Sequence, residues 1–343
     1  MEDPAIDPHF LVDYLRTLED TLAKFMFIPV LLIISLNLFH IFILSQKSIS
    51  SSSMNSLLIG IAIVEILFPI NYLKVGLREI YWKREPFECL SLESYQEIVI
   101  DWVLNAISDC FRRCSCWLGL FLAVIRTLSV RNALDKKFDF LSESKFGWKV
   151  ITITVISSTI LTVSYVFRFE IREMDVIYCE GSMGLVSVFM IMEISEYSTI
   201  GNYAKQIHLF MSGIFGKLLP CFLFPAVAIL LIIELRKASK LHSDVAIVSE
   251  KTSKIVIYMT VIFVIIEFPI GVCKLARVLF PGNTNLTLIS RSIETLLNMI
   301  YICLTATHSM ICFAMSSQYR WTVKHFFGAN GANSKIVSVI EVK

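Results

Sequence analysis

The chain of 343 residues is 55% hydrophobic and only 17% charged, whereas soluble domains are about 25% charged. This excess of apolar side chains excludes an ordinary soluble protein and indicates a membrane protein, while the net charge of +2 says little about partners. No catalytic constellation, glycine-rich phosphate loop or metal-ligand cluster stands out. We therefore expect no enzyme, no cofactor, no metal site and no binding to nucleic acid.

Seven apolar runs are each long enough to cross a bilayer as a helix, which takes about 20 residues. They lie approximately at 25–45, 56–74, 98–125, 149–168, 207–235, 255–280 and 288–315. None shows the alternation of a membrane β-barrel strand. The pattern predicts an all-α membrane protein, with an N-terminus over 1–24, a seven-transmembrane helix bundle over 25–315, and an amphipathic helix and tail over 316–343.

Loop charges predict the orientation. With the N-terminus outside, the inner segments hold more Lys and Arg than the outer ones, as cytoplasmic loops usually do. The same orientation places the glycosylation sequon Asn285-Leu-Thr287 in the short outer loop between the sixth and seventh spans. Residues 1–24 are acidic and the first apolar run is long enough to span, so we expect no cleaved signal peptide.

The chain has nine cysteines, and only Cys89 and Cys179 fall in predicted outer loops. That side of the membrane is oxidising, so a disulfide can persist there. We therefore predict a Cys89–Cys179 bridge that ties the top of the third span to the second outer loop. The other cysteines lie in or near spans, where a free thiol commonly acts as a small hydrophobe.

Polar, aromatic and proline residues stand at characteristic places along the spans. They are Asn37 in the first span, Glu65 in the second, Ile125-Arg126-Thr127 at the inner end of the third, Pro220 in the fifth, Phe263 six residues before Pro269 in the sixth, and Trp82 seven residues before Cys89. In this order and on these spans, they resemble the pattern of rhodopsin-like G-protein-coupled receptors. The resemblance covers roughly residues 30 to 325, which is nearly the whole chain.

Three longer stretches narrow the resemblance. They are Asp109-Cys-Phe-Arg-Arg-Cys-Ser-Cys-Trp-Leu-Gly119, Lys217-Leu-Leu-Pro-Cys221, and His308 followed by Met315-Ser-Ser-Gln-Tyr-Arg320. They look like the serpentine receptor class W family of nematodes, which is similar to FMRFamide-type and other neuropeptide receptors. The resemblance implies a cell-membrane receptor that transmits the binding of an extracellular ligand, a neuropeptide, to a cytoplasmic heterotrimeric G protein.

The chain departs from the common receptor pattern at several switch positions. Ile125 replaces the acidic neighbour that restrains the arginine, Glu267 replaces a tryptophan before the proline of the sixth span, and His308-Ser309 replaces Asn-Pro. Because Ile125 cannot form an ion pair with Arg126, the substitution predicts activity without ligand.

Ionisable side chains inside a span are costly and usually face the bundle or water. We therefore expect the ligand to meet residues from this group: Asp109, Arg112, Arg113, Lys217 and Glu267. Asp109 and Arg113 are four residues apart and can pair on one helix face. By the family register, Arg112 and Glu267 should face each other at the cavity floor. A purely structural salt bridge between helices is the alternative for each residue.

The resemblance also implies residues for coupling and switching. Arg126 and Leu134 would contact the G protein, although Arg126 could instead be a basic anchor at the inner membrane surface. The expected switch residues are Asn37, Glu65, Ser115, Phe263, Pro269 and His308. Among them Glu65, Ser115 and His308 would form a polar cluster in mid-bundle, where a fixed hydrogen bond with no switching role is the alternative.

Two classes of function remain open at this stage. A receptor would bind its ligand among the outer halves of the third, fifth, sixth and seventh spans, and the acidic second outer loop favours a basic peptide. A seven-span transporter or ion channel is the alternative. Transporters commonly carry repeated halves, and residues 25–168 do not visibly repeat in 207–315, which favours the receptor.

Overall fold

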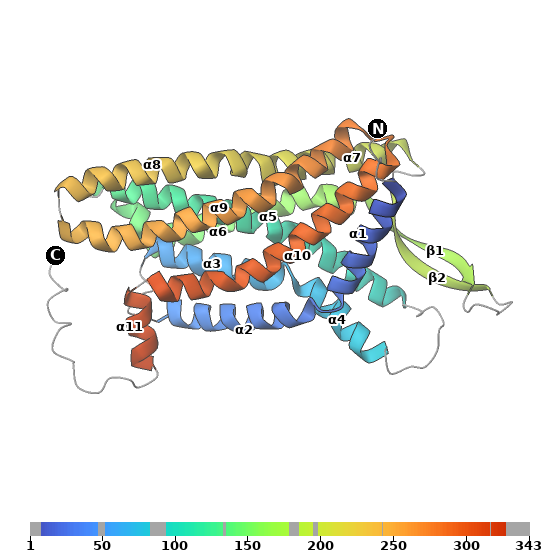
Figure 1. Ribbon diagram of the computed structural model, residues 1–343, viewed down its shortest axis with the longest axis horizontal. Helices are drawn as coiled ribbons and strands as arrows, with labels where there is room; N and C mark the ends of the chain where they lie inside the picture. Colours follow the sequence, from blue (N-terminus) through green and yellow to red (C-terminus); the bar gives the residue numbers. More distant parts are fainter. Residues whose placement is uncertain are drawn as a thin grey trace, which may run out of the picture.

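The computed structural model describes residues 8–46, 52–82, 94–132, 135–177, 185–194, 198–241, 243–315 and 317–326. These residues form a bundle of long helices with one hairpin at the end where the N-terminus lies (Figure 1). The elements are α1 (Pro8–Ala23), α2 (Phe27–Leu44), α3 (Ser53–Leu67), α4 (Ile70–Trp82), α5 (Tyr95–Arg131), η1 (Lys136–Ser142), α6 (Ser144–Val166), β1 (Phe169–Ile177), β2 (Leu185–Glu193), α7 (Thr199–Gly213), η3 (Ile214–Leu218), α8 (Leu219–Leu241), α9 (Ser243–Leu279), α10 (Thr284–Met315) and α11 (Ser317–Phe326).

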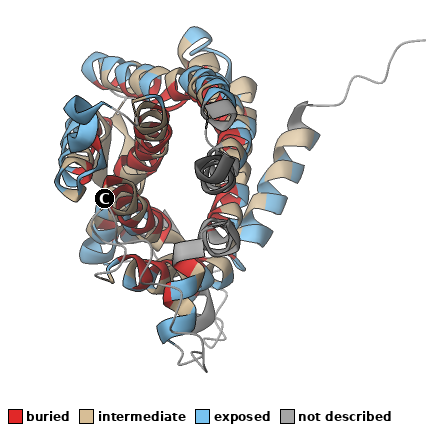
Figure 2. Ribbon diagram, turned by 90° about the vertical axis from the view of Figure 1, so that its left-hand side faces the viewer, coloured by how far each residue is buried: buried red, intermediate tan, exposed pale blue. Residues whose placement is uncertain are grey.

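The predicted all-α seven-helix fold is confirmed. Within the described residues, six segments are long and apolar enough to cross a membrane: Phe27–Leu44, Ser53–Arg78, Tyr95–Arg131, Ser144–Val166, Thr199–Lys237 and Thr284–Thr305. Helix α9 packs between α8 and α10 and completes the bundle. Seen along the bundle, exposed residues face outward and buried residues lie where the helices meet (Figure 2).

Local sequence explains how the second and third spans are divided and started. Pro69 lacks a backbone N–H, so the second span breaks between α3 and α4 at this residue. Helix α5 begins with a capping box, in which Ser94 Oγ accepts from the amide of Glu97 and the Glu97 carboxylate accepts from the amide of Ser94. At 37 residues, α5 is about 55 Å long and therefore extends well beyond the hydrocarbon core.

The fifth span changes its winding where Pro220 enters. A proline cannot donate to the carbonyl four residues earlier, here Gly216, and its ring crowds that carbonyl. The preceding segment η3 (Ile214–Leu218) is a single π-helical turn between α7 and α8, the usual form of such a disruption. The bulge places Lys217 inside the bundle with its side chain only 3% exposed.

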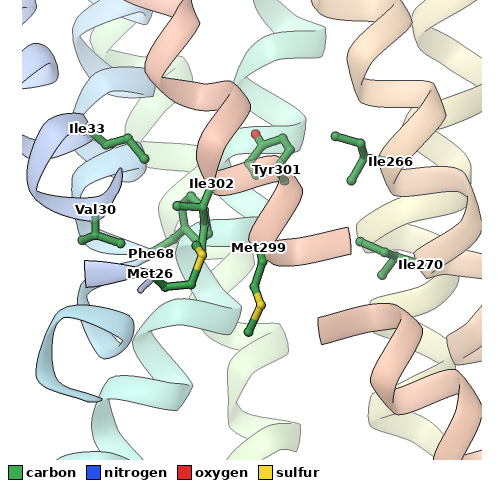
Figure 3. Packing of buried hydrophobic residues seen from close by; sticks show 9 residues of the cluster. All are labelled: Met26, Val30, Ile33, Phe68, Ile266, Ile270, Met299, Tyr301 and Ile302. Carbon is green, nitrogen blue, oxygen red and sulfur yellow. The ribbon is translucent and has the colours of Figure 1, made fainter. Parts of the chain in front are cut away.

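The main apolar cluster joins the first, sixth and seventh spans with the break in the second. Its members are Met26, Val30, Ile33, Phe68, Ile266, Ile270, Met299, Tyr301 and Ile302 (Figure 3). A second cluster joins α3, α5 and α6 and includes Leu57 and Ile125, and a third joins α5, α8 and α9 and includes Phe263. These clusters hold the polar residues described below at fixed depths.

Two elements at the hairpin end of the bundle were not anticipated. Residues 8–23, expected only as an extracellular N-terminus, include the helix α1, which packs on α10. The second outer loop is a β-hairpin, in which β1 and β2 pair antiparallel from Phe169–Glu193 to Ile177–Leu185. The sequon also lies in the first turn of α10 instead of a loop, and Asn285 is half-buried there.

The expected amphipathic helix after the seventh span is confirmed as α11. Tyr319 lies buried under the inner end of the bundle, where its hydroxyl is 3.0 Å from Nδ1 of the fully buried His40. On the other side of α11, Trp321 is exposed, as expected for an aromatic residue at the membrane interface.

Candidate functional site: a cationic cavity in the outer half of the bundle

A cavity of about 240 Å³ lies between the spans in the half of the bundle that carries the hairpin. Its charged lining consists of Asp109, Arg112, Arg113, Lys217, Lys274 and Glu294. Four of the five residues expected at the ligand site therefore line this cavity. The fifth, Glu267, is not among the lining residues but is fully buried beside it and pairs with two of them.

The cavity floor is a group of three charges from three spans. Glu267 on α9 forms an ion pair with Arg112 of α5, and its other carboxylate oxygen lies 2.7 Å from Lys217 Nζ. The structure thus contains the Arg112–Glu267 contact expected from the register, and adds Lys217 to it. The Arg112 guanidinium also lies 3.4 Å above the ring of Tyr301, a cation–π contact that the surrounding apolar residues strengthen.

The wall of the cavity on α5 is anchored to α6. Arg113 forms the expected ion pair with Asp109 one turn earlier. Its Nη2 also donates to the carbonyl of Ser158 at 3.2 Å and to the hydroxyl of Thr162. A charge with several partners can remain buried without a counter-ion from solvent, so this pair holds α5 against α6.

The upper wall contains a second charged group that the sequence analysis missed. Glu294 on α10 lies 3.1 Å from Lys274 Nζ and also pairs with Arg277, both on α9. Lys274 Nζ donates to Ser212 Oγ on α7 at 2.8 Å. The criterion of an ionisable side chain inside a span applies equally to these three residues, and Lys274 lies two turns after Glu267, so a complete scan would have found them.

Glycines let the fifth and sixth spans approach closely at the site. A Cβ on Gly271 would lie 2.8 Å from the Leu218 side chain and 3.1 Å from Cβ of Lys217, and one on Gly216 would lie 3.2 Å from Cγ of Arg113. Any larger residue would push α9 or α5 away from η3. These glycines therefore allow Lys217 to reach Glu267.

Between the cavity and the hairpin lies a wider vestibule of about 640 Å³, and the two share Glu294 and Asn298. One wall is strand β2, whose last residue, Glu193, pairs with Arg168 and lies 2.8 Å from Lys205 and 3.1 Å from Arg291. Glu193 therefore joins the end of the hairpin to the turn after α6, to α7 and to α10. Burial acts to raise the pKa of Glu193, but Arg168, Lys205 and Arg291 outweigh it and hold the pKa at about 2.

Replacing Glu193 by glutamine should loosen the hairpin. The variant loses its charged contacts, which are worth roughly 2 kcal/mol. The population of the locally open hairpin, and with it the rate of amide exchange, should therefore rise about thirtyfold. Hydrogen exchange of the β1 and β2 amides at pH 7 measures this. Because the folded pKa is lowered from 4.5, the contribution of wild-type Glu193 to stability is complete above about pH 4.5 and is lost as the pH falls towards 2.

The matched control is Glu170→Gln on β1. Within the described residues, Glu170 forms an ion pair with its near neighbour Arg172, and the two side chains are 33% and 40% exposed. Exposed pairs contribute little, so hairpin exchange should hardly change. Equal protection in wild type and Glu193→Gln would show that strand pairing alone holds the hairpin in place.

The expected switch residues are only partly connected in the structure. Ser115 Oγ lies 2.9 Å from the Tyr301 hydroxyl, and Glu65 on α3 and Asn37 on α2 are both buried. Phe263 stacks on Phe224 with ring centres 4.8 Å apart, and Pro269 lies inside α9. His308 belongs to α10, but its side chain is outside the described residues, so its place in the cluster stays a prediction.

Several other predicted contacts involve residues that the structure does not describe. Cys89, Cys179 and Leu134 lie outside the described residues, and the predicted disulfide is not tested. Arg126 lies near the inner end of α5, partly buried, with Nη1 3.7 Å from the sulfur of Met54. Ile125, which precedes Arg126 in the sequence, is buried in the cluster of α3, α5 and α6.

The described residues thus form a seven-helix membrane bundle with a deep polar cavity open to one side, the architecture of a membrane receptor. The chain belongs to the serpentine-type seven-transmembrane GPCR chemoreceptor family Srw, whose family model matches residues 24–330. No curated protein matches the sequence. The family match supports the receptor over the transporter or channel and covers every residue of the candidate site.

Proposed function

We propose that this chemoreceptor detects a peptide that inserts an anionic or carbonyl-rich end into the cavity and activates a heterotrimeric G protein. The observation that supports this proposal is the charge balance at the site. Four cationic side chains (Arg112, Arg113, Lys217 and Lys274) line the cavity, whereas only three acidic ones (Asp109, Glu294 and Glu267) line it or lie buried beside it. In a low-dielectric cavity, the excess positive charge favours a ligand carboxylate or carbonyl group.

Arg112 is the strongest candidate for the deepest ligand contact. Its Nε and Nη1 donors have no hydrogen-bond partner among the described residues, although the side chain lines the cavity. Buried donors without a partner are costly, so a ligand group that accepts hydrogen bonds from them would remove this cost and bind more tightly. The vestibule above has room for further residues of a peptide, which supports a peptide over a small odorant.

The acidic outer loop was expected to favour a basic peptide, and the structure qualifies that expectation. Glu193 is paired with cations, and Asp175 accepts a hydrogen bond from Ser187 at 2.7 Å. Local partners therefore offset part of the acidic charge on the hairpin. We propose that long-range attraction contributes to the approach of the peptide, and that the cationic cavity decides which end enters.

The proposed orientation has the N-terminus and hairpin outside and α11 inside. It agrees with the loop charges, the acidic 1–24 segment and the place of the cavity. The Cys89–Cys179 disulfide and a glycan on Asn285 remain part of this proposal. Mass spectrometry of nonreduced protein tests the first, and enzymatic deglycosylation of wild type against Asn285→Gln tests the second.

The test of function is a calcium assay in cells that express the chain with promiscuous G proteins, screened against a neuropeptide library. Each peptide is supplied both as the free carboxylate and as the C-terminal amide, which separates recognition of an anion from that of a carbonyl. The most active peptide should lose at least roughly tenfold in potency on Arg112→Lys, because a lysine cannot donate two parallel hydrogen bonds. An unchanged potency would place the ligand elsewhere.

A further inference from the structure

The N-terminal helix α1 divides into three faces. With a residue every 100°, Leu11, Leu15, Glu19 and Ala23 form a face that is partly buried. A second face, on one side of the first, carries Phe10, Tyr14, Leu18 and Leu22, and all four are exposed. The third face, on the other side, carries the exposed residues Asp13, Arg16, Asp20 and Lys24.

The partly buried face fixes α1 against the bundle. Helix α1 packs on α10, and Ala23 contacts the apolar cluster of the first, sixth and seventh spans. Glu19 lies within hydrogen-bond reach of Ser292 and Thr295 on α10 and lines the vestibule. Figure 1 shows α1 crossing the outer end of the bundle instead of running along it.

The exposed apolar face has no cover within the described residues. Phe10 is 69% exposed and Tyr14 59%, which is unusual for four large side chains in one row facing water. The row continues through Phe25 into Ile28 and Leu32 of the first span, both at least half exposed. Those residues face lipid because the span crosses the bilayer, so exposed apolar residues continue along the chain from the first span into α1.

We propose that α1 lies in the interface of the outer leaflet, with Phe10, Tyr14, Leu18 and Leu22 in the lipid and the charged face in water. This is the arrangement of an interfacial amphipathic helix. The water-facing charges, Asp13 and Asp20 against Arg16 and Lys24, cancel, so binding needs no anionic lipid. The bilayer then holds the vestibule wall that carries Glu19.

The experiment uses the full chain in phosphatidylcholine nanodiscs, with a genetically encoded environment-sensitive fluorophore in place of Leu18. The control chain carries the fluorophore in place of Asp20, which lies about 200° away around the helix. Phosphatidylcholine brominated on its acyl chains should quench the fluorophore at residue 18 several-fold more than at residue 20. Adding anionic lipid should leave this difference unchanged.

Disruption of the stripe provides the second measurement. The combined substitutions Tyr14→Asp and Leu22→Asp should reduce quenching at residue 18, because they remove the apolar neighbours that hold the helix in lipid. Equal quenching at residues 18 and 20 would overturn the proposal. A blue-shifted but unquenched signal at residue 18 would also overturn it, because protein would then cover the stripe. Neither readout depends on ligand or G protein, so failure leaves the proposed function intact.

Discussion

Glu267→Ala should be among the most damaging single substitutions in the chain. The change leaves Arg112 and Lys217, with side chains 8% and 3% exposed, without the carboxylate that both contact. Removing one member of a buried ion pair typically costs 3–5 kcal/mol, since the remaining charge is stranded. We expect loss of surface expression and a strongly lowered unfolding temperature of the purified protein in detergent.

The form of rescue distinguishes a charge effect from a packing defect. The double variant Arg112→Glu with Glu267→Arg should restore only part of the folding that either single substitution loses. Lys217 would then face an arginine at position 267. Adding Lys217→Glu to the exchange should restore more. The matched control Glu234→Gln affects a pair with Lys237, which is 66% exposed, and should change stability by less than about 0.5 kcal/mol. A well-folded Glu267→Ala protein would contradict the energetic role of the triad.

Arg126→Ala should abolish nucleotide exchange on the G protein while ligand binding persists. Arg126 lies 14 residues after Arg112 on α5, about 21 Å further along the helix, so the cavity should not respond to its loss. Two charge-assisted hydrogen bonds to an inserted partner helix, at about 1.5–3 kcal/mol each, would account for a loss of at least roughly a hundredfold. Exchange of labelled GTP with purified receptor and G protein measures the effect, with and without agonist.

Two further variants separate a G-protein contact from a membrane anchor. Arg126→Lys keeps the positive charge but not the planar guanidinium, so it should remain defective if the arginine contacts carbonyls of the partner. Arg131→Ala removes an exposed cation five residues later and should leave exchange nearly normal. Full activity of Arg126→Lys would indicate that any cation suffices. An absence of exchange without ligand in the wild type would contradict the effect expected from Ile125.

The sequence by itself determined the seven spans and much of the cavity floor. Hydrocarbon excludes unpaired backbone groups, so long apolar runs must form helices. The number and order of these helices follow from the pattern of apolar residues along the sequence. The fixed period of a helix then places Asp109 and Arg113 on one face and turns Arg112 about 100° away from Arg113. The partner of Arg112 could be predicted because Glu267 occupies a known register on the sixth span.

Only the tertiary structure decided which additional charges complete the site. Lys217 reaches Glu267 because η3 adds a π-turn and Gly271 admits close approach, and neither geometry is encoded in a local period. Glu193 joins Arg168, Lys205 and Arg291 across elements as far as 98 residues apart. Contacts at such separations depend on how the helices pack. For Lys217 and Glu193, the sequence therefore identifies the charges but not their partners.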